Sequence, residues 1–277
     1  MTYARPASDV RPGPNTISVV AHRGSSEDVP EHTLAAYRKA IEDGADALEC
    51  DVRLTADGHL VCVHDRRVDR TSNGRGAVSA LELSALSALD FGAWKNQDEA
   101  PHRERSSVLT LERLLELVAD SGRRIELAVE TKHPTRWAGH VEARLLELLR
   151  RFGLTDPPAG ELPAVRVMSF SARSLQRVRL GAPRVPTVYL MQFISPRLRD
   201  GRLPGGAQIA GPSMRILRNH PEYVERARRA GNQVHVWTVD SPADVERCVR
   251  LGVDAIITNR PKQVLSQLGR PYRPPAP

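Results

Sequence analysis

Hydrophobic positions along this chain fall into two patterns, short continuous runs and stripes at helical spacing. The continuous runs lie at 17–22, 45–52, 59–65, 125–131, 165–170, 186–191, 207–211, 233–239 and 254–258. Runs of this kind, rich in valine, isoleucine and leucine, are typical of strands buried on both faces of a parallel sheet. We therefore predict nine strands.

Segments between these runs carry apolar residues at helical spacing. Such stripes lie at 34–41, 111–118, 141–148 and 242–251. Thr110 and Ser241 are predicted N-caps, and Gly44 and Gly252 are predicted stop signals. Alternating strands and helices predict a mostly parallel sheet. With 277 residues the chain also has the size of one barrel, about 250 residues. The predicted fold class is α/β, a TIM-type (β/α)8 barrel.

The second and third strand runs explain why one strand exceeds the eight of a closed barrel. Their connection is shorter than a parallel crossover requires, and Asp57-Gly58 within it is a hairpin signal. One strand of this irregular hairpin is expected to be antiparallel or to lie outside the barrel. A two-residue turn at Asp57-Gly58 would place His64 opposite Asp51, whereas a three-residue turn would reverse the face.

The remaining segments set the domain boundaries. Residues 66–109 have little strand signal apart from a short helix near 79–88, and we expect them to be inserted after the hairpin. Residues 195–206 are predicted as a loop. The predicted divisions are a disordered tail at 1–15, a single barrel domain at 16–268 and a disordered tail at 269–277.

The chain is basic, with a net charge of +7 from 40 Lys+Arg and 33 Asp+Glu. Such a balance favours an anionic partner. The cations are spread without a dense basic run, and aromatic residues make up only 4%. Nucleic-acid binding is therefore not expected, and an anionic small molecule is favoured.

Cysteine usage and hydropathy suggest a location. Cys50, Cys62 and Cys248 form no C-x-x-C pair, which argues against a disulfide scaffold or a cysteine zinc site. The first residues lack the apolar segment of a secretory signal, and no apolar run approaches the ~18 residues of a membrane span. We expect a cytoplasmic protein without a stable membrane anchor.

Candidate chemistry lies where predicted strands end, because the carboxyl ends of barrel strands form the active face. His22 and Arg23 follow the first strand, and Gly24 then permits a tight turn. A histidine transfers protons near neutral pH, and an arginine binds phosphate through two hydrogen bonds. Taken alone, the pair is more typical of a structural strand end.

Acidic residues mark two further strands. Glu49 and Asp51 lie two apart in an apolar run, so their side chains share one face. Glu130 and Lys132 do the same at the end of the fourth run. Carboxylates in apolar surroundings need a partner, and three of them suit a hard cation such as Mg²⁺ or Ca²⁺. The competing interpretation is a set of strand-end ion pairs.

Two weaker candidates end other runs. His64 closes the third run, where a surface histidine before a turn is the alternative interpretation. Trp237, near the end of the eighth run, could form the wall of a substrate pocket or fill the core.

Taken together, these fragments follow the motif order of a known family. They are His22-Arg23-Gly24, Pro30-Glu31-His32-Thr33, Glu49-Cys50-Asp51, His64-Asp65, Glu130-Thr131-Lys132, Trp237-Thr238-Val239-Asp240 and 254–261. Over residues 17–268 the chain resembles the glycerophosphodiester phosphodiesterase family. Three positions depart from that family's pattern. His32 and Asp240 stand where asparagine is usual, and Asn259 stands where aspartate is common.

The resemblance implies a cation site and a phosphate site. Glu49, Asp51 and Glu130 would hold one divalent cation, Mg²⁺ or Ca²⁺. Arg23 and Lys132 would neutralise phosphate charge as it grows. The implied substrate is a small-molecule phosphodiester, which is hydrolysed to sn-glycerol 3-phosphate and an alcohol.

It also implies an acid–base pair. His22 and His64 would act on opposite sides of phosphorus, one as acid and the other as base, in either assignment. Glu31 is expected to orient Arg23 or His22, and Trp237 to contact the substrate. The nucleophile would be a glycerol hydroxyl or water.

Two alternatives remain open at this point. A lysophospholipase D or another phospholipase-type phosphodiesterase can occupy the same barrel, because fold alone does not fix the substrate. A barrel that binds phosphodiesters without turnover is the second alternative, and the complete set of metal and proton-transfer positions argues against it.

Overall fold

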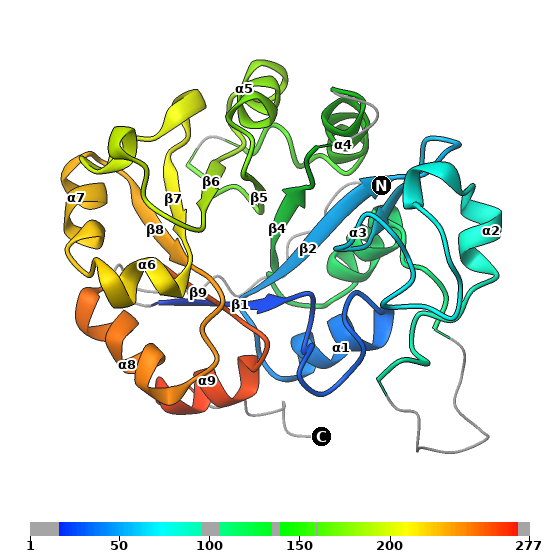
Figure 1. Cartoon of the computed structure of the whole chain (residues 1–277), viewed down its shortest axis with the longest axis horizontal. Helices are drawn as coiled ribbons and strands as arrows, with labels where there is room; N and C mark the ends of the chain where they lie inside the picture. The colour runs from blue at the N-terminus through cyan, green and yellow to red at the C-terminus, as the bar shows by residue number, and fades with distance from the viewer. Residues whose placement is uncertain (1–16, 96–105, 135–138, 159, 271–277) are drawn as a thin grey trace.

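Eight parallel strands close into a barrel that is surrounded by helices (Figure 1). The computed structural model describes residues 17–95, 106–134, 139–158 and 160–270. The barrel strands are β1 (Ser18–His22), β2 (Ala47–Leu54), β4 (Glu126–Thr131), β5 (Val165–Ser169), β6 (Thr187–Met191), β7 (Ile209–Pro212), β8 (Gln233–Val236) and β9 (Ala255–Thr258). Pairing of β1 with both β2 and β9 closes the barrel. The predicted TIM-type fold is confirmed.

The extra strand is β3 (Leu60–Cys62), which pairs antiparallel with β2 outside the barrel. This confirms the expected irregular hairpin, and its turn is the three-residue alternative and not the two-residue one. Thr55 N–H donates to the His59 carbonyl (2.9 Å), and the Thr55 hydroxyl accepts from the His59 N–H (2.9 Å). The turn therefore contains three residues, with Gly58 at a left-handed φ of 86°.

This turn changes the position expected for His64. Leu54 pairs with Leu60, and Val63 N–H donates to the Asp51 carbonyl (3.0 Å), so His64 does not lie opposite Asp51. Instead His64 follows the end of β3, and Arg53 fixes its carbonyl with two hydrogen bonds of 3.0 and 2.7 Å.

Helices cover the outside of the barrel (Figure 1). They are α1 (Leu34–Glu42), α2 (Leu83–Ser87), α3 (Leu111–Ala119), α4 (His140–Arg151), α5 (Ala172–Gly181), α6 (Met214–Asn219), α7 (Tyr223–Arg229), α8 (Pro242–Leu251) and α9 (Pro261–Gln267). Thr110 and Ser241 accept hydrogen bonds from backbone N–H groups of α3 and α8, which confirms both predicted N-caps. Gly252 ends α8 in the left-handed conformation.

Apolar side chains fill the inside of the barrel. They are Val20, Ala47, Ala128, Met168, Val188, Leu190, Ile209, Ala255 and Ile257. Two larger clusters pack between the strands and the surrounding helices. A packed interior of this kind leaves the carboxyl ends of the strands as the place for a site.

The insertion forms a small cluster of its own beside β3. A 3-10 turn (Val78–Ala80) and α2 occupy the stretch expected to be helical, and Val68, Leu86 and Phe91 pack there against Val61. The predicted loop 195–206 contains two 3-10 turns.

The predicted N-terminal tail lies outside the described residues. Of the predicted C-terminal tail only Gly269 and Arg270 are described, and Arg270 forms an ion pair with Asp46 (2.6 Å). Within the described ranges, none of the helices has the length and apolar character that crossing a bilayer would require.

Candidate active site

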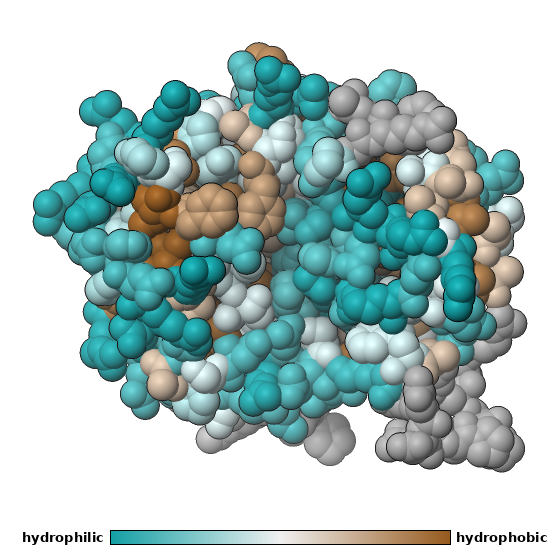
Figure 2. Space-filling model, viewed as in Figure 1, coloured by the Kyte–Doolittle hydropathy of each residue, from teal (hydrophilic) through white to brown (hydrophobic). Residues whose placement is uncertain are grey.

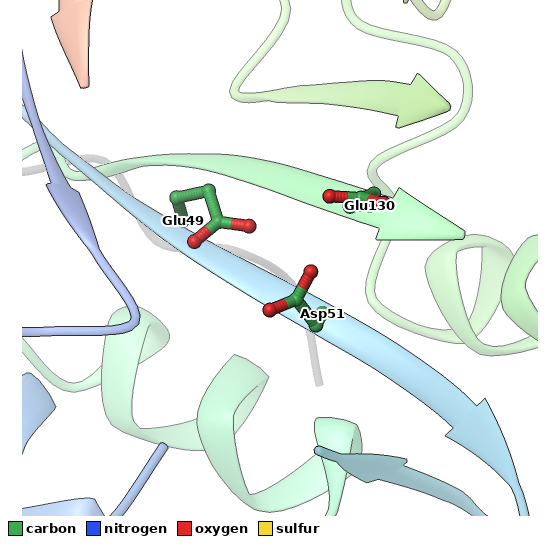
Figure 3. Close-up of side chains that lie close together, drawn as sticks. All are labelled: Glu49, Asp51 and Glu130. Atoms are coloured by element: carbon green, nitrogen blue, oxygen red, sulfur yellow. The ribbon is translucent and has the colours of Figure 1, made fainter. Parts of the chain in front are cut away.

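Three carboxylates gather at the carboxyl ends of β2 and β4 (Figure 3). Glu49 and Asp51 project from β2, and Glu130 lies beside Asp51 in the register of β4. One oxygen of each carboxylate lies within 4.8 Å of the others, and all three residues are buried. The structure thus brings together the acids that the period of two had placed on one face of each strand.

Electrostatics at this cluster favour a bound cation. Burial and repulsion from Asp51 raise the pKa of Glu49 and raise that of Glu130 to about 8. Burial also opposes ionisation of Asp51, but His32, Lys132 and Arg23 outweigh it and hold its pKa well below the usual range. An all-oxygen set of three buried acids under mutual repulsion fits a hard divalent ion.

Two basic side chains border the acids. Lys132 Nζ lies 2.9 Å from Glu130 Oε1 and 3.2 Å from Asp51 Oδ1. Arg23 Nε lies 3.1 Å from Asp51 Oδ2, and the backbone N–H of Arg23 donates to Glu49 Oε2 (3.0 Å). Arg23 holds a left-handed φ of 59°, which is uncommon outside glycine and indicates that its surroundings determine its conformation.

The turn after β1 depends on Gly24. Its φ is 84°, and an added Cβ would lie 2.6 Å from the Ala36 carbonyl carbon of α1. Gly122 has a φ of 70° but open space around it. Alanine at either position would have to adopt a left-handed φ. A comparison of the two alanine variants therefore measures the effect of the close contact between Gly24 and α1 alone.

Gly24→Ala is expected to lower the melting temperature clearly more than Gly122→Ala. A left-handed alanine alone costs about 1–2 kcal/mol, which corresponds to roughly 2–8 °C at this chain length. The clash with α1 should at least double that loss for Gly24→Ala. Thermal unfolding of both variants checks this, and equal losses would show that α1 accommodates the methyl group.

The two candidate histidines have different partners. His22 ends β1, and its Nδ1 lies 2.7 Å from Asn259 Oδ1. Burial and the charge of Arg23 lower the pKa of His22 to about 4. His64 is partly exposed, its Nδ1 lies 2.6 Å from Asp65 Oδ1, and burial lowers its pKa. One imidazole thus lies against an amide and the other against a carboxylate.

A charge network connects His64 to Arg23. Arg70 Nε donates to Asp65 (2.7 Å), and the other two Arg70 nitrogens donate to the two oxygens of Glu31 (2.7 and 2.9 Å). Glu31 in turn accepts from Arg23 Nη1 (3.0 Å). Of the two residues that Glu31 was expected to orient, it therefore contacts Arg23. Sequence reasoning missed Arg70, although it lies in the segment that resembles the family after His64-Asp65.

His32 contacts the acidic cluster directly. Its Nε2 lies 2.9 Å from Asp51 Oδ2, and its Nδ1 lies 2.8 Å from the Tyr37 hydroxyl. The ring is buried, with 6% of the residue exposed. His32 therefore orients Asp51, and the Tyr37 hydroxyl holds the other ring nitrogen of His32. The sequence marked His32 only as a departure from the family pattern. Its contact with Asp51 forms only in the folded chain, so no sequence signal could have revealed it.

Trp237 lies at the rim on the side away from the acids. Its indole N–H donates to the Gly211 carbonyl (2.7 Å), and its ring meets Phe170 edge to face at 5.5 Å. The surface view shows the same division (Figure 2). Hydrophilic residues gather over β2 and β4, and hydrophobic residues gather around β6 and β7.

The chain is similar to known proteins over most of its length. Residues 22–263 match the family model described as the glycerophosphoryl diester phosphodiesterase family. A Mycobacterium tuberculosis protein named "Probable glycerophosphodiester phosphodiesterase 1" is 46% identical over 245 residues, which cover 88% of this chain and 89% of that protein. A Caldanaerobacter subterraneus glycerophosphodiester phosphodiesterase is 34% identical, covering 90% of this chain and 96% of that protein.

A solved structure shares the fold. The crystal structure of glycerophosphodiester phosphodiesterase from Agrobacterium tumefaciens superposes with a TM-score of 0.72 at 27% identity, covering 91% of this chain and 100% of that one. The similarity therefore extends over the whole barrel and not over isolated motifs.

Proposed function

The chain belongs to the glycerophosphoryl diester phosphodiesterase family, and we propose on this premise that it hydrolyses glycerophosphodiesters at the acidic cluster. The products would be sn-glycerol 3-phosphate and an alcohol. One observation carries the proposal. Three buried carboxylates and the basic side chains of Arg23 and Lys132 meet at the carboxyl ends of β2 and β4, with histidines on neighbouring segments.

Glu49, Asp51 and Glu130 would hold one divalent cation, with Mg²⁺ or Ca²⁺ favoured by the all-oxygen set. When bound, such an ion supplies Lewis-acid stabilisation of the phosphate charge. Burial supports the site, because three acids in this environment would otherwise repel one another.

Arg23 and Lys132 bind the phosphate and offset its remaining charge in this proposal. Both are already directed to the site by ion pairs with Asp51. Glu31 holds the Arg23 guanidinium in place from the opposite side (3.0 Å), so little side-chain freedom is lost when substrate binds. Trp237 forms the apolar wall against the substrate.

His22 and His64 divide the proton transfers. His22, with a pKa lowered to about 4, is neutral near pH 7 and takes the proton from the nucleophile. His64 gives a proton to the leaving alcohol. Burial lowers the pKa of His64, and the Asp65 carboxylate at 2.6 Å opposes this by stabilising the protonated form. The nucleophile is a glycerol hydroxyl or water.

Release of glycerol 3-phosphate from glycerophosphocholine and glycerophosphoethanolamine by the purified protein tests this function. We expect release with Mg²⁺ or Ca²⁺ and its loss in chelator, with a melting temperature in chelator that shows the protein still folded. Undiminished release in chelator would remove the cation from the proposal. Cleavage of lysophosphatidylcholine alone would instead establish the lysophospholipase D activity.

A further inference from the structure

Two of the three departures from the family pattern lie in contact with each other. Asn259 Nδ2 donates to Asp240 Oδ2 (2.7 Å), and the Asn259 backbone N–H donates to Asp240 Oδ1 (2.8 Å). The Thr258 hydroxyl donates to the same Oδ1 (3.0 Å). With three hydrogen bonds, the Asp240 carboxylate is fixed between the segments that follow β8 and β9.

This carboxylate determines which way the Asn259 amide faces. A carboxylate only accepts hydrogen bonds, so the amide nitrogen must lie on its side. The amide oxygen then faces the opposite side, 2.7 Å from His22 Nδ1 and 2.8 Å from the Ser26 hydroxyl. An amide oxygen carries no proton, so His22 Nδ1 must donate. The lone pair of the neutral imidazole is therefore on Nε2.

We propose that Asp240 and Asn259 are positioning residues that hold His22 in its Nδ1–H tautomer and leave Nε2 free to take the proton of the nucleophile. This inference rests on the proposed role of His22. In the other tautomer His22 would offer an N–H where a lone pair is needed. Loss of the Nδ1–H tautomer should therefore reduce turnover and leave substrate binding unchanged.

The geometry further indicates that the acid and the amide can be exchanged. A carboxylate at 259 would accept from His22 Nδ1 with one oxygen and from an amide at 240 with the other. The oxygen of that amide would still accept from the 259 N–H and from Thr258. The same hydrogen bonds are then made with the same net charge.

Single substitutions should break this arrangement. In Asp240→Asn the new amide keeps its oxygen toward Thr258, so two NH₂ groups oppose each other and the Asn259 amide turns its NH₂ toward His22. In Asn259→Asp two carboxylates face each other at the 2.7 Å spacing now occupied by donor and acceptor. We expect each to lower kcat about 100-fold, the upper end for orienting partners, with KM nearly unchanged.

The double variant Asp240→Asn/Asn259→Asp should return kcat to within about tenfold of the wild type, the lower end for such partners. Thr258→Val removes one hydrogen bond to the same carboxylate without turning the amide, and serves as the matched control with little change in kcat. Tautomers are measured independently of turnover by ¹⁵N–¹H correlation of the histidine rings, with His22→Gln used for assignment.

The Nδ1–H form of His22 is expected in the wild type and the double variant, and its loss is expected in Asp240→Asn. A folded Asp240→Asn protein with wild-type kcat and tautomer overturns the proposal, and so does a folded double variant as impaired as the single ones. Where a single variant does not fold, the double variant decides. If the tautomer changes and kcat does not, then His22 is not the base, and the proposed role of His22 is wrong.

Discussion

His64→Ala is expected to lower kcat on glycerophosphocholine by about 10²–10⁴, the usual contribution of a general acid or base. It should have little effect on the p-nitrophenyl ester of glycerol 3-phosphate. Choline leaves as an alkoxide unless it receives a proton, whereas p-nitrophenolate is stable without one. If His64 is the acid beside Asp65 (2.6 Å), only the first substrate needs it.

His22→Ala should lower turnover of both substrates to a similar extent, because the nucleophile loses its proton acceptor in either case. His59→Ala is the matched control. It lies in the same hairpin as His64, is exposed at the turn, and is paired only loosely with Asp57 at 3.8 Å. Steady-state kinetics on the two substrates, with melting temperatures for all three variants, complete the comparison.

Three outcomes would contradict these assignments. Equal losses on both substrates in His64→Ala would take the acid role away from His64. Near-normal turnover in His22→Ala would exclude His22 as the base. The reversed pattern, with p-nitrophenyl ester activity retained in His22→Ala only, would exchange the two roles.

How far the sequence predicts this site depends on which contacts are local. Glu49 and Asp51 share a strand, so a period of two suffices to place them together. Glu130 follows from the shared edge of parallel strands. Strand positions and helix caps were likewise predictable, because burial and capping act over a few residues.

The hairpin register was not predictable in the same way. Asp57-Gly58 favours a two-residue turn, but the Thr55 side chain accepts from the His59 N–H and bonds Asp57, which stabilises a three-residue turn. A single residue of difference reverses a face, and here it depended on one hydroxyl. His64 nevertheless remains a site candidate. It lies beyond the end of β3, where Arg53 binds its carbonyl, so its side chain does not depend on the face of the strand.

Contacts between distant segments were also beyond the sequence. Arg70 joins Glu31 to Asp65, and the Asp240–Asn259 pair joins two loops. The sequence marks Glu31 and Asp65 as motif residues and Asp240 and Asn259 as departures from the family pattern, but it does not show which residues meet. Only the closed barrel brings them into contact, so their roles could be inferred only from the fold.

Glu130→Gln should remove the metal response and nearly all activity, and it should stabilise the metal-free protein increasingly as the pH rises through about 8. Loss of one of three ligands is expected to lower kcat/KM about a thousandfold, since a catalytic metal ion contributes several kcal/mol. Saturating Mg²⁺ or Ca²⁺ at 100 times its Kd should add about 2.7 kcal/mol to wild-type stability, or roughly 5–10 °C. Glu130→Gln should gain little.

The sign of the pH dependence follows from the raised pKa. The folded protein holds the Glu130 proton up to about pH 8, whereas the unfolded chain releases it near the ordinary value of about 4.5. Stability from this group is complete below about pH 4.5 and is lost as pH rises through about 8. Glutamine has no such loss, so the metal-free variant should exceed the wild type increasingly from pH 5 to 8.

Glu126→Gln is the matched control on the same face of β4, at the opposite end of the strand. It removes the negative charge that pairs with the buried Arg166 at 2.7 Å, so it should lower the melting temperature and yet retain the metal response and the activity. A general loss of stability therefore cannot imitate the Glu130 result. If Glu130→Gln kept its thermal response to Mg²⁺ and Ca²⁺, Glu130 would not be a ligand, and the raised pKa would reflect burial beside Asp51 alone.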